Sequence, residues 1–419
     1  MWETVRNSWP LFFGMFLLMM GQGLLSTLLT LRAGGLGFTE SAIGLVQSGY
    51  PAGQILGCLL APRLVLRAGH VRTFGALASI ASAATLMHLV TFDAASWGAL
   101  RLTTGFSYAG LFIVAESWLN GHATNRNRAS LLSIYFVIQA SGIAAGQLFL
   151  GTSSPDAVLL FVIVSVMISL ALVPILLSAN VSPRFETPER LSFKQLFRLS
   201  PMGVTGSLLN GISQGALYVG LALYGSALGL AAGATGLFII ALTLGGIASQ
   251  FPVGRLSDHT DRRTVIVSVA GLAVPVCIAL ALMTPDASQA FWRYGGVAVL
   301  GALVLPVYSL CLAHTNDHLH PGQIVPASSA MVLILGLGIT VGATAGPAAM
   351  QRLGPNGLFW FVAAVQILTV ATALFRLWRA GVPEATRGNV VAVGHGATAM
   401  AAHLNPDAPF RETDVNEDA

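Results

Sequence analysis

Twelve long apolar runs constrain this chain more than any other feature of its sequence. About 20 apolar residues in a helix are enough to cross a hydrocarbon core of about 30 Å. Backbone N–H and C=O groups find no water inside that core, so each run must be a helix rather than an open strand. The runs lie at about 10–31, 42–65, 72–92, 97–118, 129–151, 157–178, 201–226, 233–255, 264–284, 294–314, 325–350 and 355–376. Only 9% of the 419 residues are charged, against about 25% in a soluble domain. We therefore predict an all-α polytopic membrane protein with twelve transmembrane helices.

The positions of the basic residues predict how these helices are oriented. Cytoplasmic loops of membrane proteins carry an excess of Lys and Arg. With the N-terminus in the cytoplasm, most of the 21 basic residues fall on the cytoplasmic side. The exceptions are Arg32, Arg101, Arg293 and Arg352. We therefore expect both termini in the cytoplasm, and a first helix that is retained rather than cleaved as a signal peptide.

The longest internal loop divides the predicted helices six and six. We expect four parts: an N-terminal six-helix half at 1–178, a cytoplasmic linker at 179–200, a C-terminal six-helix half at 201–379 and a disordered cytoplasmic tail at 380–419. In the linker, Arg190, Lys194 and Arg198 recur every four residues among Leu and Phe, which predicts a short amphipathic helix on the membrane surface. The tail is rich in Gly, Pro, Ala and charged residues, a composition typical of disorder.

The second half of the sequence repeats features of the first. A shift of the chain that carries Gln22 onto Gln214 also superimposes several glycines and arginines. The same shift pairs Gly23 with Gly215, Gly37 with Gly229, Gly44 with Gly236, Gly53 with Gly245, Arg63 with Arg255 and Arg101 with Arg293. Because the shift does not reverse the direction of the chain, we predict two parallel repeats related by an axis along the membrane normal.

Glycines spaced four residues apart occur in two of the predicted helices. They are Gly142 and Gly146 in one helix, and Gly338, Gly342 and Gly346 in another. Small residues at this spacing allow two helix backbones to approach closely inside a membrane. We predict that these glycines pack against neighbouring helices.

The segment between the eighth and ninth runs, FPVGRLSDHTDRR (251–263), carries a dense set of charges. Its Gly254, Leu256, Asp258, Arg262 and Arg263 resemble the signature loop of the major facilitator superfamily, Gly-x-Leu-x-Asp-x-x-x-Arg-Arg. Twelve helices in two parallel halves is also that superfamily's plan. RLTTGFSYAG in the fourth run and the AES…RNR segment after it are similar to a bacterial branch, the YcaD-type permeases. The resemblance implies a transporter of the bacterial inner membrane.

The charges of this signature segment predict a gate. A carboxylate at Asp258 can accept hydrogen bonds from arginines, and cations can complement a neighbouring helix terminus. We expect Gly254, Asp258, Arg262 and Arg263 to lock one face of the protein and to release it when the halves move. The alternative is that the charges only set topology and solubility. The matching loop of the first half has Leu66 where a partner carboxylate would stand, so we expect any lock to be stronger in the second half.

Glu116, in the stretch VAESWLNGHATNRNR (114–128), is the only carboxylate that we place inside a predicted helix. The resemblance implies an acidic residue at this helix end that packs against arginines. We therefore expect a latch from Glu116 to one of four arginines: Arg63, Arg67, Arg126 or Arg128. A proton relay is the alternative. Arg101 lies about 22 Å away along a helix that rises 1.5 Å per residue, so the two side chains cannot bond directly.

Polar side chains within the runs predict the substrate pathway. Such groups are costly inside a membrane and tend to face a cavity or a partner helix, and repeat transporters bind substrate near the midplane between their halves. We place six residues along this pathway: Gln22, Arg101, Gln139, Asn210, Gln214 and Tyr218. The last three recur every four residues and so share one helix face. Arg101 is expected to contact an anionic substrate or to take part in proton coupling. The alternatives are interhelical hydrogen bonds for the amides and an anchoring role for Arg101.

Several classes of protein find no support in the sequence. A phosphate-binding loop, a Ser/His/Asp set and an HExxH motif are all missing from the sequence, so we expect no enzyme and no cofactor. The basic residues are scattered rather than gathered into a stripe, which argues against nucleic-acid binding. Cys311, His314, His318 and His320 are ligand types for metals, but we predict no metal site.

We therefore predict a secondary transporter that moves a small solute by alternating access, with proton coupling left open. Its expected partners are a small-molecule substrate, membrane lipids and, if coupled, protons, and we expect a monomer. Two alternatives stay open. One is a sensor or assembly factor that keeps the fold without transporting, and the other is a lipid or metal carrier.

Overall fold

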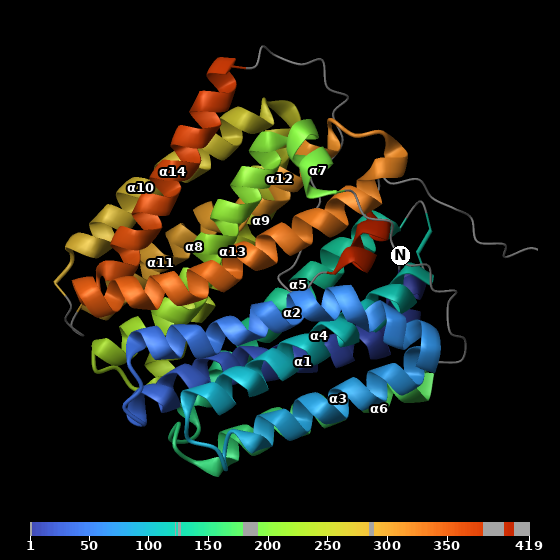
Figure 1. The fold of residues 1–419 in the computed structure, drawn as a ribbon, viewed down its shortest axis with the longest axis vertical. Helices are drawn as coiled ribbons and strands as arrows, with labels where there is room; N and C mark the ends of the chain where they lie inside the picture. The colour runs from blue at the N-terminus through green and yellow to red at the C-terminus, as the bar shows by residue number, and fades with distance from the viewer. Residues whose placement is uncertain are drawn as a thin grey trace, which may run out of the picture.

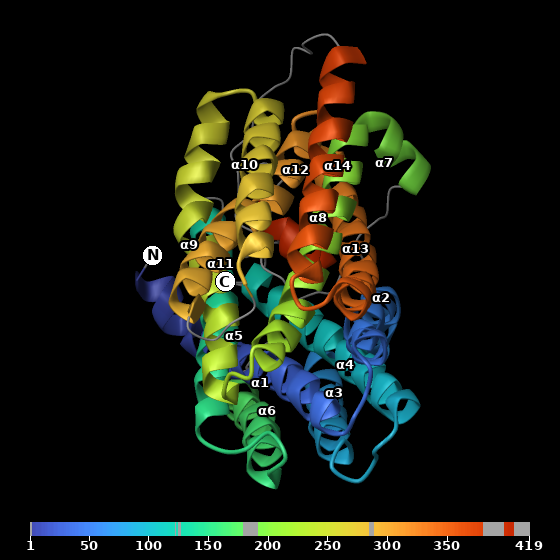
Figure 2. The same ribbon diagram turned by 90° about the vertical axis from the view of Figure 1, so that its left-hand side faces the viewer.

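The fold is all-α and consists of two helical halves, as predicted (Figure 1). The computed structural model describes residues 2–121, 123–124, 127–178, 192–284, 289–379 and 398–405. Within these residues every regular element is a helix. Figure 2 shows the second half above the first, each as a bundle of its own.

Six long helices form the first half. They are α1 (Trp2–Gly35), α2 (Glu40–Ala68), α3 (His70–Met87), α4 (Ala94–Gly121), α5 (Arg128–Leu148), followed by the 3₁₀ helix η1 (Phe149–Gly151), and α6 (Val158–Ser178). The turn between α2 and α3 is a single residue, Gly69, whose φ of 81° lies in the left-handed region that glycine adopts without strain. This glycine therefore lets two long helices follow each other directly.

The second half follows a short connecting helix, α7 (Phe193–Leu199). Its helices are α8 (Pro201–Ala227), α9 (Ala232–His259), α10 (Arg262–Leu282), α11 (Ala290–Val304), α12 (Val307–Asn316), the 3₁₀ helix η3 (Pro321–Gln323), α13 (Ile324–Leu353) and α14 (Gly357–Arg379). A last 3₁₀ helix, η4 (Ala399–Leu404), lies in the C-terminal tail. The predicted run 294–314 is broken between α11 and α12 at Pro306, which has no backbone N–H to continue the helical ladder.

Among the described residues, nine helical segments are long and apolar enough to cross a membrane. The helices α2, α3 and α8 are not in that set, although they pack against helices that are. The helix α8 carries Asn210, Gln214 and many glycines, which lower its hydrophobicity. The chain is thus a multi-pass membrane protein.

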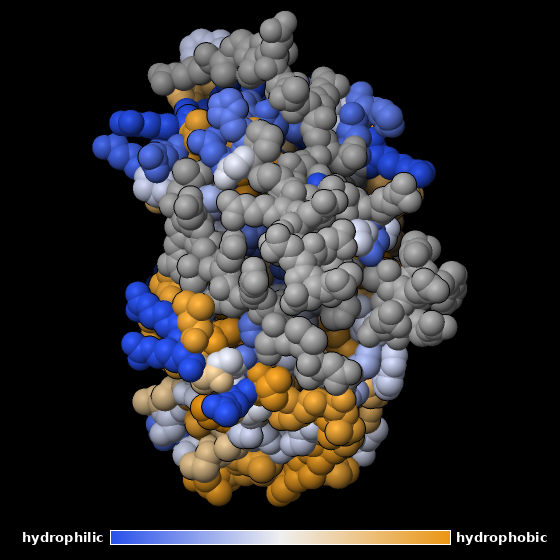
Figure 3. All heavy atoms as spheres, turned by 90° about the vertical axis from the view of Figure 1, so that its right-hand side faces the viewer, coloured by the Kyte–Doolittle hydropathy of each residue, from blue (hydrophilic) through white to orange (hydrophobic). Residues whose placement is uncertain are grey.

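The two halves touch each other at one end of the molecule and diverge at the other. We call the end where α2 meets α3, α4 meets α5 and α9 meets α10 the arginine-rich end. Away from it, α2 packs on α13 and α5 packs on α9, and the Ser41 amide donates to the Gln351 side chain over 3.2 Å. Figure 3 views the molecule from the arginine-rich end, where hydrophilic side chains lie on both halves.

Close helix packing confirms the role predicted for the spaced glycines. On α13, Gly338 and Gly342 face the backbone of α8, and on α5, Gly142 and Gly146 face the backbone of α1. A methyl group at Gly342 would stand 2.0 Å from the carbonyl oxygen of Ile212. Such a contact is possible only if one of the two backbones moves.

We predict that Gly342→Ala lowers the thermal stability of the purified protein. Overpacking a close contact costs about 1–3 kcal/mol, which outweighs the gain of up to about 1 kcal/mol that alanine brings to a helix. The control is Gly295→Ala on α11, where an added Cβ would meet no atom of the described residues within 4 Å. Melting in detergent checks both variants, and equal melting temperatures would contradict the close packing of α8 and α13.

Candidate functional site

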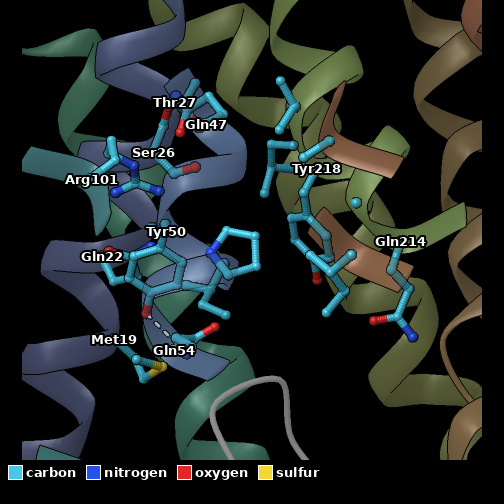
Figure 4. A pocket seen from close by; sticks show the side chains of 18 of the residues that line it. Met19, Gln22, Ser26, Thr27, Gln47, Tyr50, Gln54, Arg101, Gln214 and Tyr218 are labelled. Carbon is cyan, nitrogen blue, oxygen red and sulfur yellow. Dashed lines mark hydrogen bonds between the residues drawn. The ribbon is translucent and has the colours of Figure 1, made fainter. Parts of the chain in front are cut away.

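A cavity lies between the two halves near the middle of the bundle (Figure 4). Its empty volume, including open solvent at its mouth, is about 810 Å³. It is lined by Met19, Gln22, Gly23, Ser26, Thr27, Gln47, Tyr50, Pro51, Gln54, Arg101, Ile143, Gln147, Gln214, Gly215, Tyr218, Val219, Ile239, Ile339 and Ala343. Both halves contribute, so a movement of one half against the other changes the shape of the cavity.

Arg101 supplies the only formal charge among the described residues that line this cavity. Its side chain is 1% exposed, and its guanidinium carbon lies 4.5 Å from the centre of the Tyr50 ring, a distance that allows a cation–π interaction. Within the described part of the chain, its Nε and Nη1 have no hydrogen-bond partner. A buried cation with unused donors is costly, and an anionic ligand would relieve that cost.

Buried amide groups that line the same cavity supply acceptors. The Gln47 Nε2 donates to the Ser26 carbonyl over 2.8 Å, and the Gln147 Nε2 donates to the Gly23 carbonyl over 2.8 Å. These bonds hold the amide nitrogens against α1. The side-chain oxygens of Gln47 and Gln147, like that of Gln22, have no partner among the residues that the structure describes. The cavity therefore offers acceptors as well as the Arg101 donors.

The structure places the predicted pathway residues in two groups. Four line the cavity: Gln22, Arg101, Gln214 and Tyr218. Asn210 instead lies behind Gln214, since its Oδ1 accepts from the Gln214 Nε2 over 2.6 Å and its Nδ2 donates to the Val304 carbonyl over 2.7 Å. Gln139 is buried on α5 and is not part of the lining. Asn210 thus positions Gln214 rather than facing the cavity itself.

The helix α2 supplies cavity residues that we did not predict. Gln47, Tyr50 and Gln54 all line the cavity, and the Gln54 Nε2 donates to the Tyr50 hydroxyl over 3.4 Å. Their spacing of three and four residues puts them on one helix face. This polar stripe was visible in the sequence and identifies the face of α2 that points away from lipid.

The signature segment forms an ion-pair cluster within the second half. The Arg262 Nε binds the Asp317 Oδ2 over 2.6 Å, and its Nη1 binds the Asp258 Oδ1 over 3.2 Å. Asp317, which follows α12, was not predicted. Gly254 and Arg263 are also buried here. The charges bind α9, α10 and α12 to one another, and the ion pairs found among the described residues do not cross to the first half.

Glu116 is fully buried at the end of α4, and its carboxylate accepts three sets of hydrogen bonds. The Tyr135 hydroxyl donates over 3.1 Å, the backbone N–H groups of Thr398 and Ala401 donate over 3.0–3.1 Å, and the Thr398 hydroxyl donates as well. A buried carboxylate needs such donors to offset the loss of water. Two of its partners thus belong to the C-terminal tail.

These partners differ from the arginines that we predicted for the latch. Arg63 is exposed on α2, Arg128 is buried at the start of α5, and Arg126 lies outside the described residues. In the described structure the hydrogen-bond donors that reach Glu116 are a hydroxyl of α5 and groups of the tail. Among the described residues, Glu116 thus joins α4 to α5 and to the tail rather than to the predicted arginines.

The sequence model of the Major Facilitator Superfamily matches residues 11–334. The chain belongs to this superfamily. It is similar to the uncharacterized MFS-type transporter YcaD of Escherichia fergusonii, with 28% identity over 358 residues that cover 85% of this chain and 92% of that protein. The YcaD protein of Salmonella arizonae is 29% identical over 361 residues, again 85% of this chain and 92% of the relative. The predicted likeness to the YcaD branch is confirmed.

Two solved transporters share the superfamily fold. The nucleoside transporter NupG has a TM-score of 0.69 at 12% identity, over 88% of this chain and 98% of NupG. A bacterial homolog of the human lysosomal transporter Spinster, in an inward-facing and unoccupied conformation, has a TM-score of 0.68 at 16% identity, over 98% and 99% of the two chains. The protein is therefore a membrane transporter by family and fold.

The equivalent helix junctions of the two halves, α2–α3 in the first and α9–α10 in the second, are held by different contacts. In the second half, Arg262 and its two carboxylates join the helices. In the first half, the His70 Nε2 lies 3.0 Å from the Ser117 Oγ, and the His70 ring stacks on Trp118 at 6.2 Å between ring centres. The first half thus uses a histidine contact at this junction, whereas the second uses ion pairs.

We predict that Asp317→Asn lowers the stability of this protein more than Asp258→Asn does. Asp317 is 5% exposed and Asp258 is 26% exposed. Breaking a buried pair costs about 3–5 kcal/mol, and the cost is smaller at Asp258 because water partly solvates this carboxylate. Thermal unfolding in detergent measures the melting temperatures of both variants. A larger fall in melting temperature for Asp258→Asn would contradict the assignment of Asp317 as the main partner of Arg262.

Proposed function

We propose that the protein is a secondary transporter that moves a small anionic solute across the bacterial inner membrane by alternating access. The observation that carries this proposal is the cavity between the halves, in which Arg101 has unused donors. Substrates of repeat transporters bind near the midplane at the junction of the repeats. One chain forms the whole cavity, so we propose that it works as a monomer within the lipid bilayer.

The chemistry of the lining supports a particular class of solute. Arg101 favours an acidic group, because a guanidinium presents a planar set of donors that fits a carboxylate. The unpaired oxygens of Gln22, Gln47 and Gln147 favour N–H or O–H groups on the same solute. The described lining residues include no Asp or Glu, which disfavours an organic cation. Small carboxylates that carry amino or hydroxyl groups fit both requirements.

The distribution of arginines supports the orientation of the proposed transporter. Arg63, Arg128, Arg255 and Arg262 all belong to helix ends or turns at the arginine-rich end, so this end and both termini face the cytoplasm by the positive-inside rule. Since the halves touch at the opposite end, the conformation corresponds to an inward-facing state. In the outward-facing state we expect Gly254, Asp258, Arg262 and Arg263 to meet the first half. A proton gradient is one driving force that this cycle can use.

We predict that Arg101→Met reduces binding and uptake of such a solute at least tenfold, because a buried charge-assisted contact contributes more than about 1.4 kcal/mol. Amino and hydroxy carboxylates, each paired with its neutral amide, are the probes in thermal-shift and liposome counterflow assays. Arg352→Met is the control, since Arg352 is exposed and carries the same charge.

Two outcomes separate the parts of this proposal. If the parent protein and Arg101→Met transport a neutral or cationic solute equally well, the proposed anionic substrate is contradicted, whereas the proposed transport activity is not. An absence of counterflow with every probe, in liposomes that hold folded protein, would contradict solute transport and favour the sensor alternative.

A further inference from the structure

The C-terminal segment 398–405 occupies the space between the two halves at the arginine-rich end. Its helix η4 contacts α4 and α5 of the first half and α13 of the second. Figure 1 shows η4, in red, between these halves. The buried residues of the segment are Thr398, Met400, Ala401, Leu404 and Asn405. The segment is therefore packed against the transporter, which differs from the predicted disordered tail at 380–419.

Glu116 recognises the start of this segment through its backbone. The N–H groups of Thr398 and Ala401 both donate to the Glu116 carboxylate. The Thr398 Oγ1 in turn accepts from the Met400 N–H over 3.3 Å. The first N–H groups of a helix have no partner within the helix, and a carboxylate is their strongest acceptor. Glu116 thus accepts from the buried Thr398 N–H, and it shares the Ala401 N–H with the Thr398 carbonyl, to which that group also donates over 3.1 Å.

Asn120 binds the same segment from the next turn of α4. Its Nδ2 donates to the Met400 carbonyl over 2.7 Å. Glu116 and Asn120 are four residues apart, so they lie on one face of the helix. One face of α4 therefore accepts from and donates to the same peptide backbone. This pairing of an acceptor with a donor is a binding site for an extended or helical peptide.

The rest of the tail is long enough to bring this segment to the site. Residues 380–397 join it to the end of α14, and a chain of that length can span at most about 60 Å. The covalent connection keeps the segment at a high effective concentration near its site. Few contacts are then needed to keep it bound.

We propose that residues 398–405 form a plug that docks on Glu116 and Asn120, holds the halves apart at the cytoplasmic end and must leave before they can close. A segment wedged between α4 and α13 excludes the approach of these helices. It therefore binds one conformation only, and it stabilises that conformation by its full binding free energy. The plug would restrain transport at the inward-facing state until it is released.

Distances between spin labels test the plug in the full-length chain without a known substrate. The labels replace Leu66 on α2 and Leu256 on α9, which are both exposed at the arginine-rich end, in a variant whose native cysteines are alanine. Thr398→Pro removes the N–H and the hydroxyl that bind Glu116. We expect it to raise the ratio of short to long distances about tenfold, since a hydrogen bond to a charged group is lost. Thr398→Ser keeps both donors and should leave the distances unchanged. Equal distributions in all three proteins would overturn the proposal.

A cross-link keeps the proposal falsifiable if Thr398→Pro does not fold. Asn120→Cys and Met400→Cys place two thiols at positions that are in contact. We expect a disulfide to form on mild oxidation in membranes and to be undone by reductant. Failure of these thiols to react with each other would overturn docking of the segment. Because neither readout measures solute, these results are independent of the transport assay.

Discussion

The structure depends on one constraint, which is that polar groups inside a hydrocarbon layer must find partners within the protein. Within helices, the backbone N–H and C=O groups bond to each other. Hydroxyl groups bond to the preceding turn, as Thr85 does to the Ala81 carbonyl over 2.9 Å. Buried polar atoms without a partner among the described residues occur in several parts of the protein, and those of Gln22, Gln47, Gln147 and Arg101 line one cavity. At the cavity, unlike elsewhere, a solute could supply the missing contacts.

Close backbone contacts decide where the halves are rigid and where they can separate. Glycines bring α13 against α8 and α5 against α1 within each half. Between the halves, α2 approaches α13 at the end opposite the arginines, where a Cβ at Gly44 would stand 2.8 Å from the Ala343 carbonyl oxygen. At the arginine-rich end, the tail segment lies between α4 and α13 instead. Rigid halves that meet at one end and are bridged by a detachable segment at the other are suited to a rocking motion.

The sequence predicted the helices and the family well, and the site only in part. Gln22 and Gln214 were predicted to line the pathway because they are repeat partners, and both line the cavity. Asn210 shares a helix face with Gln214, yet it turns to the Val304 carbonyl, because a buried amide takes the nearest acceptor. Asp317 was missed because it is far from Arg262 in sequence and comes close only when α10 and α12 pack together. Helical spacing shows which residues share a face, but it does not show which neighbour that face meets.

Apolar run length, a local property of the chain, was enough to determine an all-α membrane protein, because the bilayer imposes the same conditions on every segment. The internal repeat of the sequence, in turn, predicted its two parallel halves. Only the tertiary structure decided which groups bind Glu116. Its nearby arginines predicted a latch, whereas Tyr135 and the backbone of Thr398 and Ala401 bind it. A tail whose composition favours disorder forms the short helix η4, and Glu116, distant in sequence, accepts hydrogen bonds from the Thr398 and Ala401 N–H groups at its start.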